Sequence, residues 1–145
     1  MKSGFFRKLI IRAPMVIGLL LAMVLLIAGQ TQAAYVQPSV PIILDTWVKD
    51  VVNASSPARF YTFDGSAGQY VSIQMQRDNS SLRLRPYVDL KDPYGYIVAS
   101  DDGGSSGNSL IEGYYLQSTG TYTIIAHSYN NQTYGVYWIY VTLSQ

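Results

Sequence analysis

Residues 100–109, SDDGGSSGNS, are the part of the sequence richest in groups able to do chemistry. Asp101 and Asp102 are adjacent carboxylates, and Asn108 follows them after a run of glycines and serines. Calcium prefers carboxylate, amide and carbonyl oxygens, so these three residues are candidate calcium ligands, although their spacing is not that of an EF-hand loop. Alternatively, the segment is a long turn whose aspartates accept hydrogen bonds from nearby backbone N–H groups. Both interpretations stay open at this point.

Catalytic chemistry is poorly supported by the same residues. Neighbouring residues of an extended chain point to opposite sides, whereas a glycosidase needs two facing carboxyl groups about 5–10 Å apart. His127 is the single histidine, and the absence of cysteine excludes a Cys–His dyad. No serine has the strand-turn-helix context of a nucleophile elbow. We therefore expect a protein without enzymatic activity.

Residues 1–33 have the layout of a secretory signal peptide. Four basic residues lie within the first 12 positions, and an uncharged apolar run of 14 residues follows at 15–28. Small residues come next, so we expect cleavage after Ala33 or Ala34. The apolar run is shorter than the roughly 20 residues of a spanning helix, so membrane contact is expected only through this segment if it stays uncleaved. The remaining chain is expected to be secreted or held at the cell surface.

The expected exported part is one mildly acidic domain. It carries six basic and nine acidic side chains, so it has no basic patch for nucleic acid, and we expect no nucleic-acid partner. About 110 residues are enough for a single domain that is held together by its core alone, without disulfides. All 13 tyrosines and both tryptophans fall in this part, which favours β structure.

Apolar and polar residues alternate along this part, which is typical of half-buried β-strands. In one strand Val71, Ile73 and Met75 share a face, and in another Leu82 and Leu84 are expected to face the core. The expected strands lie at 42–48, 59–65, 69–76, 82–91, 96–100, 109–116, 121–127 and 136–144. Seven or eight short strands with a turn about every ten residues predict a single antiparallel β-sandwich over 42–145, after an extended leader at 34–41.

Local signals refine this pattern. A regular strand at 109–116 would bury Glu112 unpaired, which is costly, so we expect a bulge at Gly113. Residues 92–95, DPYG, have the pattern of a type I turn. Tyr122 follows Gly120 at the start of a strand, as in a tyrosine corner, and is expected to be structural.

The order of these segments resembles the bacterial pre-peptidase C-terminal domain family. FYTFDGSAGQYVSIQM, LRPYVDLKDPYGYIVASDDGG, NSLIEGYYLQSTGTYTIIA and YGVYWIYVTL carry the resemblance, which covers about residues 47–143. It implies a jelly-roll-like β-sandwich. It also implies a non-catalytic appendage of exported proteins, implicated in secretion, localisation or substrate attachment.

Clostridial collagen-binding domains look like close structural relatives of this family, and that relation implies contacts through surface tyrosines and a calcium ion that braces the N-terminal segment. In those domains acidic residues of the linker supply much of the calcium site, whereas here no acid precedes Asp45 in the exported part. The calcium ligands of those domains are therefore not carried over. The expected signal peptide runs almost directly into the domain, so we expect any peptidase partner to be separately encoded.

Aromatic side chains give the best functional clue. If Tyr137 and Ile139 face the core, Trp138 and Tyr140 face outward on the same strand. Tyr87 is out of phase with its apolar neighbours and is also expected to be exposed. Tyrosine and tryptophan offer large contact areas with a polar tip, which suits binding. Alternatively, these aromatics pair across strands and stabilise the sheet.

We therefore expect an exported, non-catalytic binding module that recognises an extracellular protein or polysaccharide through Trp138, Tyr140 and Tyr87, with no cofactor unless calcium binds. One alternative is a cell-surface structural subunit that self-associates through strand edges, with the leader at 34–41 as a donated strand. Another is an accessory to a separately encoded secreted peptidase.

Overall fold

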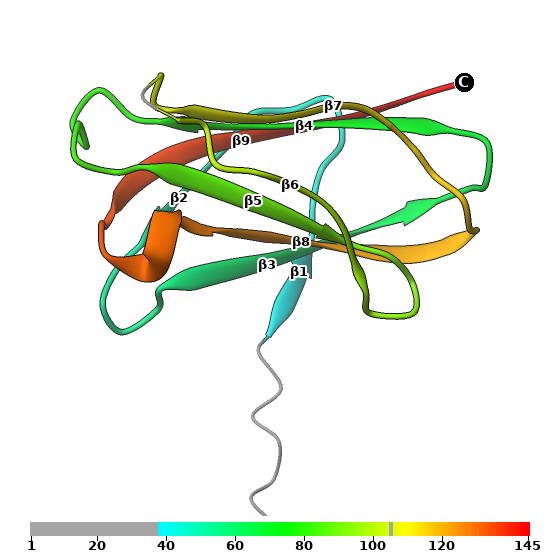
Figure 1. Ribbon diagram of the computed structural model, residues 1–145, viewed down its shortest axis with the longest axis horizontal. Helices are drawn as coiled ribbons and strands as arrows, with labels where there is room; N and C mark the ends of the chain where they lie inside the picture. Colours follow the sequence, from blue (N-terminus) through cyan, green and yellow to red (C-terminus); the bar gives the residue numbers. More distant parts are fainter. Residues whose placement is uncertain (1–37, 105) are drawn as a thin grey trace, which may run out of the picture. The chain divides into compact units, whose positions relative to one another are not determined.

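The computed structural model describes residues 38–104 and 106–145, so the expected signal peptide and positions 34–37 of the leader lie outside the described residues. The described chain is all-β, as predicted, with nine strands and one short 3-10 turn (Figure 1). The strands are β1 (Ser39–Pro41), β2 (Val48–Val52), β3 (Ala58–Gly65), β4 (Tyr70–Arg77), β5 (Pro86–Lys91), β6 (Ile97–Asp101), β7 (Asn108–Tyr115), β8 (Gly120–Ser128) and β9 (Gly135–Ser144), and the turn is η1 (Tyr129–Asn131). No helix in 38–104 or 106–145 is long and apolar enough to cross a membrane.

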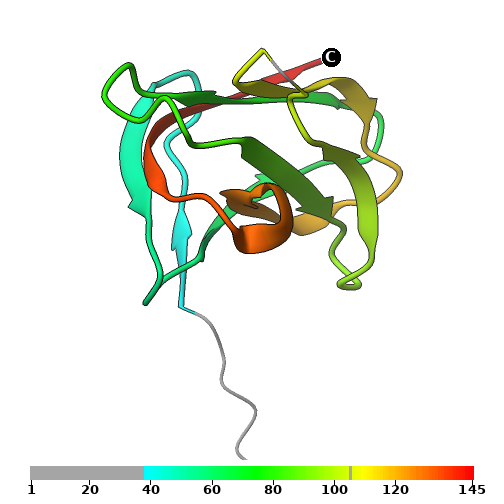
Figure 2. The same cartoon turned by 60° about the vertical axis from the view of Figure 1, so that its left-hand side comes forward.

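The strands form two sheets that pack face to face. The first sheet has the order β1-β3-β8-β5-β6, and the second sheet has the order β2-β9-β4-β7. In Figure 1, β4, β7 and β9 run across the top and β3 and β8 across the bottom, and Figure 2 shows the same two layers from another side. The named strand pairs are antiparallel except β1 with β3, which is parallel. The predicted β-sandwich is therefore confirmed.

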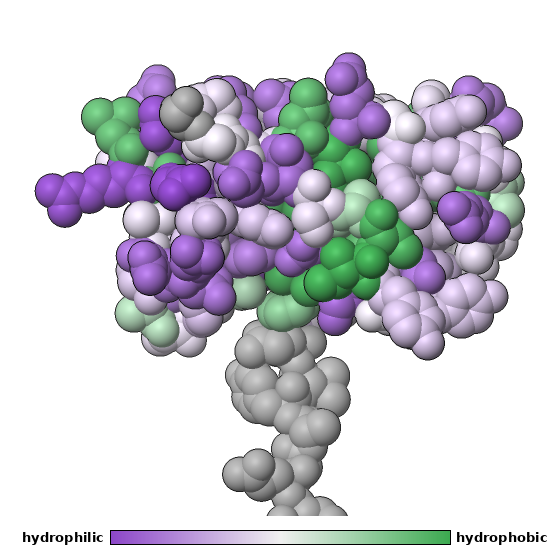
Figure 3. Space-filling model, in the orientation of Figure 1, coloured by the Kyte–Doolittle hydropathy of each residue, from purple (hydrophilic) through white to green (hydrophobic). Residues whose placement is uncertain are grey.

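The core lies between the sheets, where the apolar phase of each strand points. Val71, Ile73 and Met75 of β4 are fully buried, as are Tyr137 and Ile139 of β9, so the predicted inward positions on these strands are confirmed. Burial of such side chains stabilises a fold by about 1.5–3 kcal/mol each. The opposite phase faces solvent, and Figure 3 shows hydrophilic and weakly polar residues over much of one face, with an apolar patch near the middle of the view.

One predicted strand was wrong. The predicted strand at 42–48 is instead a crossing between the sheets, because Ile42 N donates to Thr62 O at 2.9 Å and Asp45 N donates to Val141 O at 2.8 Å. Asp45 also has a positive φ of 57°, which a strand does not accommodate. The end of the predicted leader is itself strand β1.

The predicted inward position of Leu82 was also wrong, since its side chain is 68% exposed. Two successive turns fold this segment: Ser81 N donates to Asp78 O at 2.8 Å, and Leu84 N donates to Ser81 O at 2.9 Å. The strand consequently begins only at Pro86, and Leu84 reaches the core from the turn.

The local devices expected in β7 and β8 are confirmed. Gly113 has a φ of 57°, and the pairing register between β4 and β7 shifts around Ser72. Gly113 N donates to Ser72 Oγ at 3.0 Å, which closes the bulge. Tyr122 Oη donates to Ser118 O at 2.8 Å, as in a tyrosine corner.

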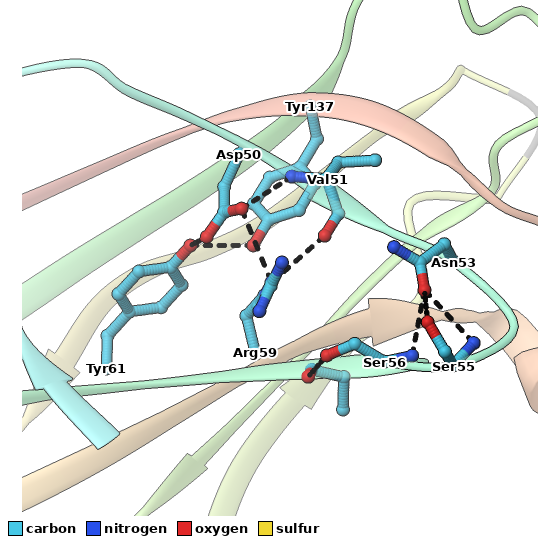
Figure 4. Close-up of polar contacts among 9 residues, drawn as sticks. Asp50, Val51, Asn53, Ser55, Ser56, Arg59, Tyr61 and Tyr137 are labelled. Carbon is cyan, nitrogen blue, oxygen red and sulfur yellow. Dashed lines mark hydrogen bonds and ion pairs between the residues drawn. The ribbon is translucent and has the colours of Figure 1, made fainter. Parts of the chain in front are cut away.

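A polar cluster ties the two sheets together at one side of the core (Figure 4). The hydroxyls of Tyr61 from β3 and Tyr137 from β9 lie 2.7 Å apart, and Tyr61 Oη donates to Asp50 Oδ2 at 2.7 Å. Arg59 Nε lies 3.3 Å from Asp50 Oδ1 and donates to Val51 O at 3.0 Å. Burial raises the pKa of both tyrosines, because ionising a hydroxyl away from water is costly.

Candidate functional site

The segment that follows β6 is a turn capped by its own side chains. Asp101 Oδ2 accepts hydrogen bonds from Gly103 N at 3.0 Å and Leu110 N at 2.8 Å. Asp102 Oδ1 accepts from Gly104 N at 3.1 Å. This geometry is what the turn interpretation predicts. Asp101, Asp102 and Asn108 stay untested candidate calcium ligands, and within 38–104 and 106–145 no three His, Cys, Asp or Glu side chains are gathered around a common point for a metal.

His127 belongs to a polar chain on the outer face of the first sheet. Its Nε2 lies 3.1 Å from Asp89 Oδ2, and Ser100 Oγ donates to the other oxygen of the same carboxylate. In a Ser-His-Asp triad the histidine stands between serine and acid, so that it can take the hydroxyl proton. Here the acid stands between the other two side chains, and His127 Nδ1 faces Ser128 O at 3.0 Å. The three side chains are therefore not arranged to activate a serine.

Tyr87 lies on this same face. Its ring centre is 4.6 Å from that of His127 and 6.3 Å from that of Tyr129, and the side chain is half-buried. Trp138 and Tyr140 belong to the second sheet, so the structure does not bring Tyr87 together with them.

Trp138 and Tyr140 face outward on β9, next to two glutamines of β4. Gln76 pairs with Trp138 in the strand register, and Gln74 pairs with Tyr140. Trp47, from the loop before β2, packs on Tyr140 with ring centres 5.2 Å apart. Trp47, Gln76 and Trp138 line one surface cleft, which we call the aromatic cleft. It brings both tryptophans of the protein to one place.

Asp78 fixes the orientation of the Trp138 indole. Its Oδ2 accepts a hydrogen bond from Trp138 Nε1 at 2.9 Å and lies 3.2 Å from Lys49 Nζ. Its Oδ1 accepts from Ser80 N at 3.0 Å and Ser80 Oγ at 2.7 Å. The two hydrogen bonds from Ser80 contribute most to holding the pKa of the Asp78 carboxyl well below its usual range. The contacts with Trp138 and Lys49 lower this pKa further. Lys49 Nζ also lies 5.0 Å from the centre of the Trp138 ring system. The indole is consequently held in place by side chains of the protein itself.

The chain resembles known proteins in its fold. No protein-family model and no curated protein matches the sequence. Among solved structures, the pre-peptidase C-terminal domain of a collagenase from Bacillus anthracis superposes with a TM-score of 0.61 at 16% identity, over 74% of this chain and 97% of that one. The chain has the fold of a pre-peptidase C-terminal domain.

A second solved structure has a similar fold. PliG from Aeromonas hydrophila, a periplasmic inhibitor of g-type lysozyme, superposes with a TM-score of 0.57 at 14% identity, over 73% of this chain and 96% of that one. At these identities the likeness is one of fold alone, so the residues of the site have to be argued from this chain.

Within this pre-peptidase C-terminal fold, the sequence pattern located only part of the aromatic cleft. The outward phase of β9 predicted Trp138 and Tyr140. Trp47 was missed because the predicted strand at 42–48 does not form, and Trp47 lies instead in a loop whose neighbours alternation does not reveal. Asp78 was missed because its contact with Trp138 spans 60 residues of sequence.

Proposed function

We propose that this protein is an exported, non-catalytic binding module that attaches to an extracellular protein or polysaccharide through the aromatic cleft. The observation that carries this proposal is the pair of tryptophans on one surface. Trp47 is 42% exposed, although so large an apolar side chain is usually covered in a stable fold. Trp138 is held by Asp78 and Lys49, so little rotamer freedom is lost when a ligand packs against it.

The proposed location and class draw on three observations. Residues 1–33 have the pattern of a secretory signal. One protein of similar fold is periplasmic and inhibits an enzyme, and the other is a domain of a collagenase, so both support a module that works outside the cytoplasm without chemistry of its own. Among the hydrogen-bonded side chains of Ser100, Asp89 and His127, the acid lies between the serine and the histidine, which is the wrong order for acyl transfer.

A second candidate is an accessory to a separately encoded secreted peptidase. The similar fold in a collagenase favours this role. It differs from the first in its ligand, because the module would then bind the peptidase or the substrate of the peptidase.

The proposal is tested by retention of the purified full-length protein on immobilised gelatin and on insoluble polysaccharides. We expect retention on at least one polymer, and a loss of about tenfold or more in Trp47→Ala and in Trp138→Ala, as for an aromatic side chain that the bound ligand covers. Tyr94→Ala is the matched control, because Tyr94 is 74% exposed but lies in the turn between β5 and β6 of the first sheet. Full retention of both tryptophan variants, with unchanged thermal unfolding, would contradict the proposal.

A further inference from the structure

We infer that the ligand is a single chain of a neutral polysaccharide, which lies along β4 from the aromatic cleft to Tyr70 and Tyr115. This inference rests on the proposed function and names the class of ligand for the same surface. It is carried by the order of side chains along the outer face of the second sheet.

A continuous stripe of outward side chains follows β4 and its two neighbours. Register pairs put Gln76 beside Trp138, Gln74 beside Tyr140, Ser72 beside Thr142 and Tyr70 beside both Ser144 and Tyr115. Alternate residues of a strand share a face and lie about 6.8 Å apart, so Gln76 and Tyr70 are separated by roughly 20 Å. This length suits several units of a linear polymer better than one small molecule.

Aromatic rings stand at both ends of the stripe. At one end is the aromatic cleft, with Trp47 packed on Tyr140. At the other end Tyr70 and Tyr115 meet edge to face, with ring centres 5.4 Å apart, and they are 42% and 49% exposed. Trp47 at one end and Tyr70 and Tyr115 at the other are exposed, so each end offers a place where a flat apolar surface of a ligand can pack.

Between the aromatic ends the stripe offers amides and hydroxyls. Gln76 is exposed and Gln74 is half-buried, and Ser72 and Thr142 add hydroxyl groups. Each amide carries two donors and one acceptor oxygen, and each hydroxyl can donate and accept. A sugar ring has an apolar face of C–H groups and a rim of hydroxyls, so it matches aromatic ends joined by neutral polar groups.

Charge favours a neutral polymer. The ammonium of Lys49 beside the cleft is already paired with Asp78 at 3.2 Å. Glu112 is exposed on the neighbouring strand β7, and its carboxylate would repel an acidic polysaccharide.

Strand pairing disfavours a peptide that would add to β4 as a further strand. β4 is paired with β7 on one side and with β9 on the other, so its backbone groups are not free to pair with an added strand.

The inference is tested with purified full-length protein on an array of immobilised neutral polysaccharides, including cellulose, chitin, β-1,3-glucan and mannan, together with heparin and gelatin. We expect binding to a neutral polysaccharide that falls about tenfold in Trp138→Ala and at least severalfold in Tyr70→Ala and Tyr115→Ala. Tyr94→Ala is expected to bind like the wild type. Each variant is first shown to unfold at the wild-type temperature.

The outcomes separate this inference from the proposed function. Binding to gelatin or heparin alone, with loss in Trp138→Ala, would overturn the neutral polysaccharide and leave the aromatic cleft as the binding site. Neutral polysaccharide binding that is unchanged in Tyr70→Ala and Tyr115→Ala would overturn the stripe along β4. Binding to none of the polymers would overturn both.

Discussion

At the scale of single residues, Asp78 links stability to the proposed binding surface. One carboxylate joins the turn after β4, through Ser80, to the indole of Trp138 and the ammonium of Lys49. A hydrogen bond to a charged group is stronger than one between neutral groups. The orientation of Trp138 therefore depends on a residue that is not itself aromatic.

Asp78→Ala is expected to free the indole and to weaken polymer binding severalfold while the fold is retained. The near-UV circular dichroism of the tryptophans should decrease, because their asymmetric surroundings are lost. Asp64→Ala is the matched control, since Asp64 is an exposed carboxylate that accepts from Thr121 on the first sheet. An unchanged tryptophan signal in Asp78→Ala would contradict the positioning role.

The lowered pKa of Asp78 also predicts the direction of a pH effect. A carboxyl whose pKa is lower in the folded state contributes stability that is present above its unfolded pKa, near 4. That contribution is lost as the pH falls below about 4. The melting temperature of the wild type should fall over this acidic range, and that of Asp78→Asn should fall less. Equal acid sensitivity in both proteins would count against the assignment.

Asp101 and Asp102 allow a sharp test of calcium. Their carboxylates already accept backbone hydrogen bonds, so we expect the same melting temperature in 10 mM calcium and in EGTA. An extracellular site with a dissociation constant of about 1 mM would add about 1.4 kcal/mol at that concentration, which shifts melting by several degrees. A rise of that size that disappears in Asp102→Asn would establish the calcium site.

At the scale of elements, the cluster of Asp50, Tyr61 and Tyr137 holds β3 against β2 and β9. Tyr61 Oη lies between the other two groups, so Tyr61→Phe leaves Tyr137 Oη buried without its partner. We expect Tyr61→Phe to lower the free energy of unfolding by about 1–3 kcal/mol, the cost of a buried unsatisfied group. Tyr137→Phe removes only the last hydroxyl of this hydrogen-bonded series, so it should lower the free energy of unfolding by less. Chemical denaturation of both variants checks which one is less stable.

Tyr61 and Tyr137 also predict that the fold loses stability at alkaline pH. The pKa of each tyrosine is raised in the folded state, whereas in the unfolded chain it is about 10. The contribution to stability is therefore complete below pH 10 and is lost as the pH rises above it. The double variant Tyr61→Phe, Tyr137→Phe should lose less stability between pH 9 and pH 11 than the wild type. Parallel pH profiles for the two proteins would contradict this assignment.

The comparison of sequence with structure shows which elements a pattern can predict. Alternation located β4 and β9 because both strands are long, central and buried on one face. It failed at Leu82, where two turns set by Asp78 and Ser81 override the apolar phase. It could not place Trp47 against Tyr140, since that contact depends on how the loop before β2 crosses to the second sheet. The cleft thus needed cross-strand register, which a single sequence does not contain.

At the scale of the whole molecule, the sheet edges decide between a monomer and a self-associating subunit. The edge strands are β1 and β6 in the first sheet and β2 and β7 in the second. β1 has three residues, β2 and β6 have five each, and β7 is interrupted by the bulge at Gly113. Short and bulged edges are common protections against pairing between molecules. Exposed apolar side chains on β6 and β7, Ile97 and Leu110, remain the strongest argument for contact between copies.

We therefore expect the protein freed of residues 1–33 to remain monomeric up to millimolar concentration, with a single species in light scattering. The physical reason is that a stable protein interface needs more than about 1,000 Å² of complementary surface, and the four edges offer only short stretches of unpaired backbone. A mass that rises with concentration would instead support the self-associating alternative. If Ile97→Lys then restored the monomer while Leu110→Lys did not, the contact would run through β6, and the outer face of the second sheet would stay free for its polymer.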